Sequence, residues 1–188
     1  MTIPEARKLI QDWYAPQPKT KEFMMERRKD PLLGRVYETP IGRIRPFGLI
    51  TEKNRNGVQN EAGNFPIQAT ASDLTVWSIC RLVEEFDKMN EELGFEAVRL
   101  VNTVHDSIIA EVWANEDIIK RTRDTFKRIM ESAGKILLNT DVPFVADAEI
   151  GHRWGSLYDF TIEESGNIIV HKKTGDISFK ELLQERTS

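Results

Sequence analysis

The segment from Gln68 to about Leu93 constrains the fold of this chain more than any other part of the sequence. Apolar residues recur there at spacings of three or four, apart from one gap bridged by Ser78, and this spacing is typical of one face of a helix. The residues of this face are Ile67, Ala71, Leu74, Leu82, Phe86, Met89 and Leu93. Gly94 follows as a helix stop. The pattern predicts a long helix that packs through a single apolar face.

Two short runs rich in β-formers, 97–104 and 107–112, follow this helix and flank His105 and Asp106. They predict a β-hairpin with the histidine and the aspartate at its turn. Asn115 then resembles an N-cap, and the acidic residues after it suit the first turn of a helix that runs to about Leu138. Its inward residues are expected to be Ile118, Ile119, Phe126, Ile129, Met130, Ala133 and Leu137.

Alternating apolar and polar residues predict a further strand over Val142–Ile150. The fold class is therefore α+β, with long helices packed on a small antiparallel sheet. The chain is expected to divide into 1–66, 67–160 and a C-terminal appendix, 161–188, which resembles a short hairpin followed by a polar helical tail.

The first part of the chain is punctuated by proline and glycine. Residues 3–29 are predicted to be helical, with Pro4 in the first turn and an interruption near Pro16 and Pro18. Residues 30–66 are predicted to form short strands and loops, including a hairpin of 36–39 with 43–45.

Length and composition are those of a folded protein. The 188 residues are 40% apolar and 30% charged, which suits one compact domain. Cys80 is the single cysteine, so no intrachain disulfide can form. No apolar run is long enough to cross a membrane, and the first residues lack the pattern of a signal peptide, so a cytoplasmic protein is expected.

The net charge of −4 is unevenly distributed. Residues 1–60 carry 12 Lys/Arg against 7 Asp/Glu, and the remaining residues carry 14 against 23. The basic part could meet phosphates while the acidic part faces solvent, metal or a partner. An uneven but merely solvated surface explains the same counts, so charge alone does not decide between these readings.

Three places in the sequence could carry chemistry. Asp106, between two apolar strands, suits a hard cation bound through carboxylate oxygen, although one carboxylate is too few for a magnesium site and a polar turn is the alternative. Asn64 and Gln68 can offer amide donors to the minor groove of DNA, with helix capping as the alternative. Arg43 and Arg45 could bind the phosphate backbone of a nucleic acid, and the alternative is that they are simply the charged side chains of an exposed edge strand.

The order of these segments resembles the C-terminal region of family A DNA polymerases, the group of bacterial DNA polymerase I and many phage replicases. The resemblance covers roughly residues 3–158. It is carried by the helix entry Asn64-Phe-Pro-Ile-Gln68, the Val-His-Asp hairpin, and the strand that ends in Gly151-His-Arg-Trp154. The upstream segments Thr39-Pro-Ile-Gly-Arg43 and Glu5-Ala-Arg-Lys8 match in the same order.

The resemblance implies a role for each matching residue. Asp106 corresponds to a palm aspartate, one of two carboxylates that bridge two magnesium ions, and His105 to a residue near the primer terminus. Asn64 and Gln68 correspond to amides that line the primer–template on its minor-groove side. Arg43 corresponds to a basic position close to the template path.

The sequence also departs from the family pattern. Ser107 stands where a glutamate usually follows the aspartate, Asn60 where an arginine is common, and Ala69 in place of a common glycine. The other palm aspartate and the fingers helix that holds the incoming dNTP have no counterpart in the chain. We therefore expect a split polymerase, completed by a partner chain and acting on primer–template DNA. The alternative is a non-catalytic DNA-binding or assembly module derived from a polymerase.

Overall fold

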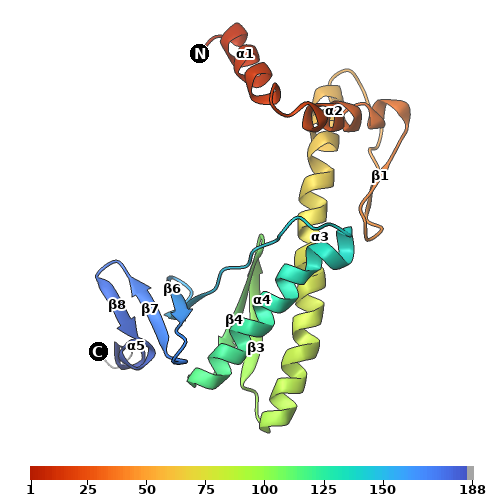
Figure 1. The fold of residues 1–188 in the computed structure, drawn as a ribbon. Helices are drawn as coiled ribbons and strands as arrows, with labels where there is room; N and C mark the ends of the chain where they lie inside the picture. Colours follow the sequence, from red (N-terminus) through yellow and green to blue (C-terminus); the bar gives the residue numbers. More distant parts are fainter. Residues whose placement is uncertain (186–188) are drawn as a thin grey trace. The chain divides into compact units, whose positions relative to one another are not determined.

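The computed structural model describes residues 1–185, and its fold is drawn in Figure 1. The chain forms two compact units, Met1–Asp73 and the residues from Leu74 onward. The combination of long helices with small antiparallel sheets confirms the predicted α+β class. None of the described helices is long and apolar enough to span a membrane.

The first unit begins with two helices, α1 (Ile3–Tyr14) and α2 (Pro18–Arg27), so the predicted helix with an interruption near the prolines is confirmed. The helix α1 starts at a capping box in which Thr2 and Glu5 satisfy each other's backbone donors. A short 3-10 helix, η1 (Asp30–Leu33), follows.

The predicted hairpin is present as two short antiparallel strands, β1 (Tyr37–Glu38) and β2 (Ile44–Arg45). Its strands pair in the register Tyr37↔Arg45 and Glu38↔Ile44. A backbone hydrogen bond of 2.8 Å from Thr39 N to Arg43 O continues the pairing beyond β1. The hairpin is therefore small, and its position against α3 depends on side-chain contacts.

The helix α3 (Arg55–Leu93) is 39 residues long and begins well before the predicted start at Gln68. The prediction of loops over 55–66 is wrong, because packing outweighs the low helix propensity of glycine and proline there. A Cβ on Gly63 would lie 3.2 Å from Arg28 Cγ and 3.3 Å from Met24 Cε, so the absent side chain lets α2 approach α3 closely. The helix passes through Pro66 without a break.

The buried face of α3 also differs from the prediction in its first half. The buried residues there are Ala62, Gly63, Pro66, Ala69 and Asp73, and they follow helical spacing. Ile67, predicted to face inward, is 54% exposed, because it lies beside this stripe of small residues and not on it. Further along, Leu82, Phe86 and Met89 are buried as predicted.

The second unit contains the predicted hairpin and the helix after it. Strands β3 (Val98–Val104) and β4 (Ser107–Val112) are antiparallel, and α4 spans Glu116–Leu138. Asn115 caps α4, accepting from Asp117 N at 3.0 Å and Ile118 N at 3.2 Å. One core joins these elements to the second half of α3, and its buried members are Leu82, Phe86, Met89, Ala97, Val98, Ile118 and Ile129.

The predicted strand over 142–150 is confirmed only at its end, in β5 (Glu149–Arg153). Residues 142–148 lie along α4 in an irregular conformation, because side chains of α4 take the place of a strand partner. Ala146 N donates to Glu131 Oε1 at 3.2 Å, and Ala146 O accepts from Lys127 Nζ at 3.0 Å. The Phe144 ring fills the space left by the missing side chain of Gly134, where a Cβ would come within 2.2 Å of it.

The chain ends in a four-stranded antiparallel sheet of order β5-β6-β7-β8. Its remaining strands are β6 (Ser156–Ile162), β7 (Ile168–Lys172) and β8 (Gly175–Ser178), and α5 (Phe179–Gln184) follows. The expected hairpin and helical tail are present over the described part of 161–188, and β6 links them to β5 in one sheet. A second core lies here, with Ile119, Ile168, Val170, Phe179 and Leu182 as its buried members.

Candidate functional site

His105 and Asp106 form the two-residue turn between β3 and β4, as the sequence predicts. His105 has φ +56°, a left-handed conformation that is uncommon for a residue with a side chain and that clusters at functional sites. Thr103 Oγ1 donates to Ser107 O at 3.0 Å and ties the two strands together beneath the turn. Asp106 is therefore held at the tip of a hairpin whose base packs into the first core.

The Asp106 carboxylate is exposed, and within residues 1–185 it takes part in no hydrogen bond or ion pair. A magnesium ion in a phosphoryl-transfer site is commonly held by one or two carboxylates together with substrate phosphates. The described residues contain no cluster of three or more acidic, histidine or cysteine ligands. Asp106 thus presents a free carboxylate of the kind that binds magnesium, and Ser107 beside it offers a hydroxyl.

Asn64 and Gln68 lie one helical turn apart on α3, and both are exposed. Residues four apart share a helix face, so the two amides point out of the same side of the helix. The alternative interpretation, helix capping by Asn64 or Thr70, is wrong, because α3 begins at Arg55 and both residues lie in its interior. Asn60 is exposed one turn earlier and extends the polar stripe.

Arg43 is partly exposed but is already engaged by a carboxylate. Its Nη2 lies 2.5 Å from Asp73 Oδ1, in an ion pair that lacks the alignment of a hydrogen bond. Thr39 Oγ1 donates to the other oxygen, Asp73 Oδ2, at 2.7 Å, and itself accepts from Arg43 N at 3.1 Å. Arg45 forms an ion pair with Glu61 of α3 and also donates a hydrogen bond to it. Both arginines of the hairpin therefore bind α3.

Asp73 is the residue that the sequence reasoning missed. It is 2% exposed and is the one carboxylate on the buried stripe of α3 among the described residues. Its spacing of four from Ala69 and seven from Pro66 could have indicated a position on that stripe, and a buried carboxylate needs a partner. The partner, however, belongs to a hairpin far away in the sequence.

Comparison with known proteins places the chain in a family. Residues 1–156 match the model of DNA polymerase family A. The DNA polymerase of Bacillus phage SP01 is 28% identical over 96% of this chain and 19% of its own length. DNA polymerase I of Aquifex aeolicus is 30% identical over 60% of this chain and 18% of its own length. The chain spans about a fifth of the length of these relatives.

A solved structure supports the fold. The polymerase domain of Pol1 from M. smegmatis, in complex with DNA primer–template and dNTP, superimposes with a TM-score of 0.55 at 20% identity, over 71% of this chain and 23% of that one. This likeness bears on the fold, and the sequence match covers most of the chain. The chain is a member of DNA polymerase family A.

Proposed function

We propose that the chain supplies part of the active site of a DNA-directed DNA polymerase that adds nucleotides under the direction of a template. The observation that carries the proposal is Asp106, an exposed carboxylate without a protein partner in the described residues, at the tip of a hairpin whose base packs into the first core. Ligands on such a packed element are held more precisely than ligands on a loop. The family match supports the reaction class.

Magnesium ions bound in such a site would activate the 3′-hydroxyl of the primer and neutralise the charge of the triphosphate. Asp106 would hold such ions through its carboxylate oxygens, and His105 beside it would lie near the primer terminus. Asn64 and Gln68 would donate amide hydrogen bonds to acceptors in the minor groove of the primer–template, where both A·T and G·C pairs present them. Arg43 would act near the template path through the part of its side chain that Asp73 leaves exposed.

The chain carries one of the two carboxylates that a two-metal site requires. We infer a complementary chain that supplies the other palm aspartate and the helix that binds the incoming dNTP, so that the site forms where the two chains meet. The two relatives described above are about five times as long as the part of them that this chain matches.

Ser107 and Asn60 favour a second candidate function, a non-catalytic module that binds DNA or assembles with a polymerase. Ser107 cannot act as a carboxylate ligand, and Asn60 cannot bind phosphate as an arginine would. Asp106, Asn64 and Gln68 argue for the catalytic role, since a module without catalysis has no need of an exposed metal ligand.

Primer extension tests the proposal. We expect extension with Mg²⁺ and dNTPs only when the chain is mixed with a complementary family A chain that carries the missing regions. Asp106→Asn should lower the rate of the pair by at least about 100-fold, since metal stabilisation of the transition state is worth several kcal/mol. Ser107→Ala is the matched control and should change the rate little.

Two results would contradict the proposal. Full extension by the pair with Asp106→Asn would remove this residue from the metal site. A stable complex of the two chains that binds primer–template but never extends it would favour the non-catalytic module.

A further inference from the structure

Pro66 interrupts the hydrogen bonding of α3 between the two exposed amides. Proline has no N–H to donate to the carbonyl of Ala62, and its ring crowds that carbonyl, so a proline inside a helix usually kinks it. Asn64 lies two residues before Pro66 and Gln68 two residues after it. A bend at Pro66 would therefore change the distance and direction between the two amides.

The hairpin of β1 and β2 contacts α3 on both sides of this proline. Before Pro66, Arg45 of the hairpin pairs with Glu61. After it, Thr39 and Arg43 both bind Asp73.

Between these contacts the hairpin also touches the helix beside the proline itself. The ring of Tyr37 packs edge-on against Phe65, with 6.2 Å between the ring centroids. The hairpin is thus attached to α3 before, beside and after Pro66.

We propose that this hairpin acts as a splint across Pro66, and that Asp73 is a positioning residue that sets the relative placement of Asn64 and Gln68. The inference rests on the proposed function in one respect, the contact of these two amides with primer–template DNA. The splint itself is a property of the free chain.

The burial of Asp73 makes it the principal attachment of the splint. Its carboxylate is 2% exposed and is compensated by the Arg43 guanidinium and the Thr39 hydroxyl. The Arg43 side chain is 45% exposed, but Asp73 is buried, so loss of its partners leaves a buried carboxylate uncompensated, which is costly. Arg45 and Glu61 are each about half exposed, and a surface ion pair of that kind contributes little.

Two measurements on the full chain test the proposal, with and without DNA. Hydrogen exchange of the free chain reports on the α3 amides around Pro66, and fluorescence anisotropy with a labelled primer–template duplex reports affinity. Asp73→Asn removes the charge and keeps the size of the side chain. Glu84→Gln is the control, since Glu84 is an exposed carboxylate of the same helix whose ion pair, within the described residues, is with Arg81 of α3 itself.

Asp73→Asn should speed exchange around Pro66 and weaken binding of the duplex about fivefold, the change that corresponds to roughly 1 kcal/mol. Adding Pro66→Ala restores the missing helix donor. It should return both exchange and affinity of the Asp73→Asn chain to nearly the parent values, because a helix without the proline has no need of a splint. Arg43→Gln, which breaks the same ion pair from the hairpin, provides a second variant should Asp73→Asn fail to fold.

Unchanged exchange and affinity in both Asp73→Asn and Arg43→Gln would overturn the splint. So would a loss of affinity that Pro66→Ala does not repair, since a general loss of stability predicts that result. A third result is that Asp73→Asn speeds exchange and Pro66→Ala restores it, while Asn64→Ala and Gln68→Ala bind the duplex like the parent. This result would overturn the DNA role of the two amides. The positioning role of Asp73 is then overturned with it.

Discussion

Gly151 is the residue at which the C-terminal sheet tolerates no side chain. A Cβ there would lie 1.9 Å from Ser156 O and 3.2 Å from Leu157 Cα, both of them backbone atoms of β6. Backbone cannot swing aside as the end of a flexible side chain can. The glycine is therefore required by the close approach of β5 and β6, where their register also shifts.

We expect Gly151→Ala to lower the free energy of unfolding by about 1–3 kcal/mol, the usual cost of forcing an extra methyl group into a packed site. Gly155→Ala is the matched control, because no atom lies within 4 Å of a Cβ at Gly155. Urea unfolding of the two variants checks the prediction. Equal stability of Gly151→Ala and Gly155→Ala would show that the strands can separate at no cost.

At the residue scale, the sequence was sufficient to predict the place of groups whose position depends on local structure. His105 and Asp106 were predicted at a hairpin turn from the apolar runs on either side, and the structure confirms that place. The burial of Asp73 was not predicted, because it depends on Thr39 and Arg43, which lie 34 and 30 residues earlier in the chain. No local pattern contains that pairing.

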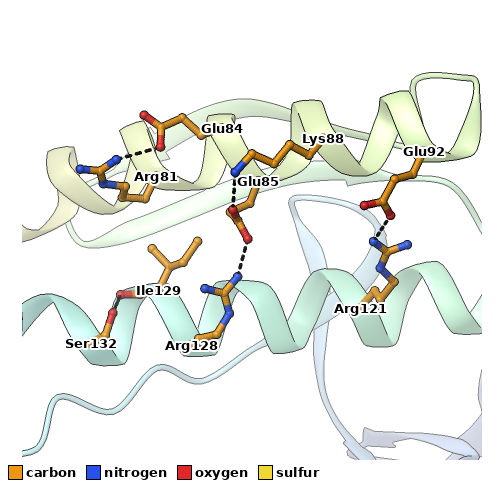
Figure 2. A network of polar contacts seen from close by, with 9 residues as sticks. All are labelled: Arg81, Glu84, Glu85, Lys88, Glu92, Arg121, Arg128, Ile129 and Ser132. Atoms are coloured by element: carbon orange, nitrogen blue, oxygen red, sulfur yellow. Dashed lines mark hydrogen bonds and ion pairs between the residues drawn. The ribbon is translucent and has the colours of Figure 1, made fainter.

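The helices α3 and α4 of the second unit are joined by charged side chains above their shared core. Figure 2 shows the Glu85 carboxylate between Lys88 and Arg128, at 3.0 Å and 2.7 Å. A second pair, Arg121 with Glu92, links the two helices further along at 2.5 Å. The hydrogen bond from Lys88, followed by that from Arg128, holds the pKa of Glu85 below its ordinary value.

This lowered pKa makes a prediction about acid stability. The folded-state pKa of Glu85 lies below its unfolded value. The ionised carboxylate therefore adds to the free energy of unfolding at pH values above the unfolded pKa, and this stabilisation is lost as the pH falls through the folded pKa. Glu85→Gln should lack that contribution at neutral pH and should lose less stability on acidification than the parent. Urea unfolding at several pH values measures both.

The size of the effect is limited by solvent, since the side chains of Glu85 and Arg128 are 35% and 61% exposed. A double-mutant cycle with Arg128→Gln should give a coupling below about 1 kcal/mol. If acidification lowered the free energy of unfolding more in Glu85→Gln than in the parent, the stabilising role of ionised Glu85 would be contradicted.

At the element scale, predictions succeeded where local pattern and packing agree. The helix α4 has a clear cap and a strong apolar face, and its bounds were predicted closely. The start of α3 was missed because Gly57, Gly63 and Pro66 argue locally for a loop, whereas contacts with α2 favour a helix. Residues 142–148 were mistaken for a strand because their alternation has the right period but no neighbouring strand provides a ladder.

Within the second unit, two hydrophobic cores share one helix. The helix α4 contributes Ile118 and Ile129 to the core with α3, and Ile119 to the core of the C-terminal sheet. The neighbouring residues Ile118 and Ile119 of α4 are thus buried in different cores. A substitution that destabilises the packing of one core should therefore also destabilise the other core through α4.

We expect Leu82→Ala in the first core and Leu182→Ala in the second each to cost about 2–5 kcal/mol, because both leucines are almost fully buried. Both variants should shift the same unfolding transition of this unit, followed by circular dichroism and tryptophan fluorescence. Val145→Ala is the control, since Val145 is 75% exposed and its truncation should change stability by less than about 0.5 kcal/mol. A separate transition for Leu182→Ala would show that the C-terminal sheet unfolds on its own.

For the whole molecule, the sequence by itself determined the α+β class, most of the helices, the hairpin that carries Asp106 and the likeness to family A polymerases. These follow from periodicity, caps and turn residues, which act over a few positions. Only the tertiary structure decided that α3 continues through Pro66, that Asp73 is buried against the β1–β2 hairpin, and that residues 142–148 lie on α4. Each of these depends on contacts between segments far apart in the chain, whose energies outweigh the local preferences of glycine, proline and alternating residues.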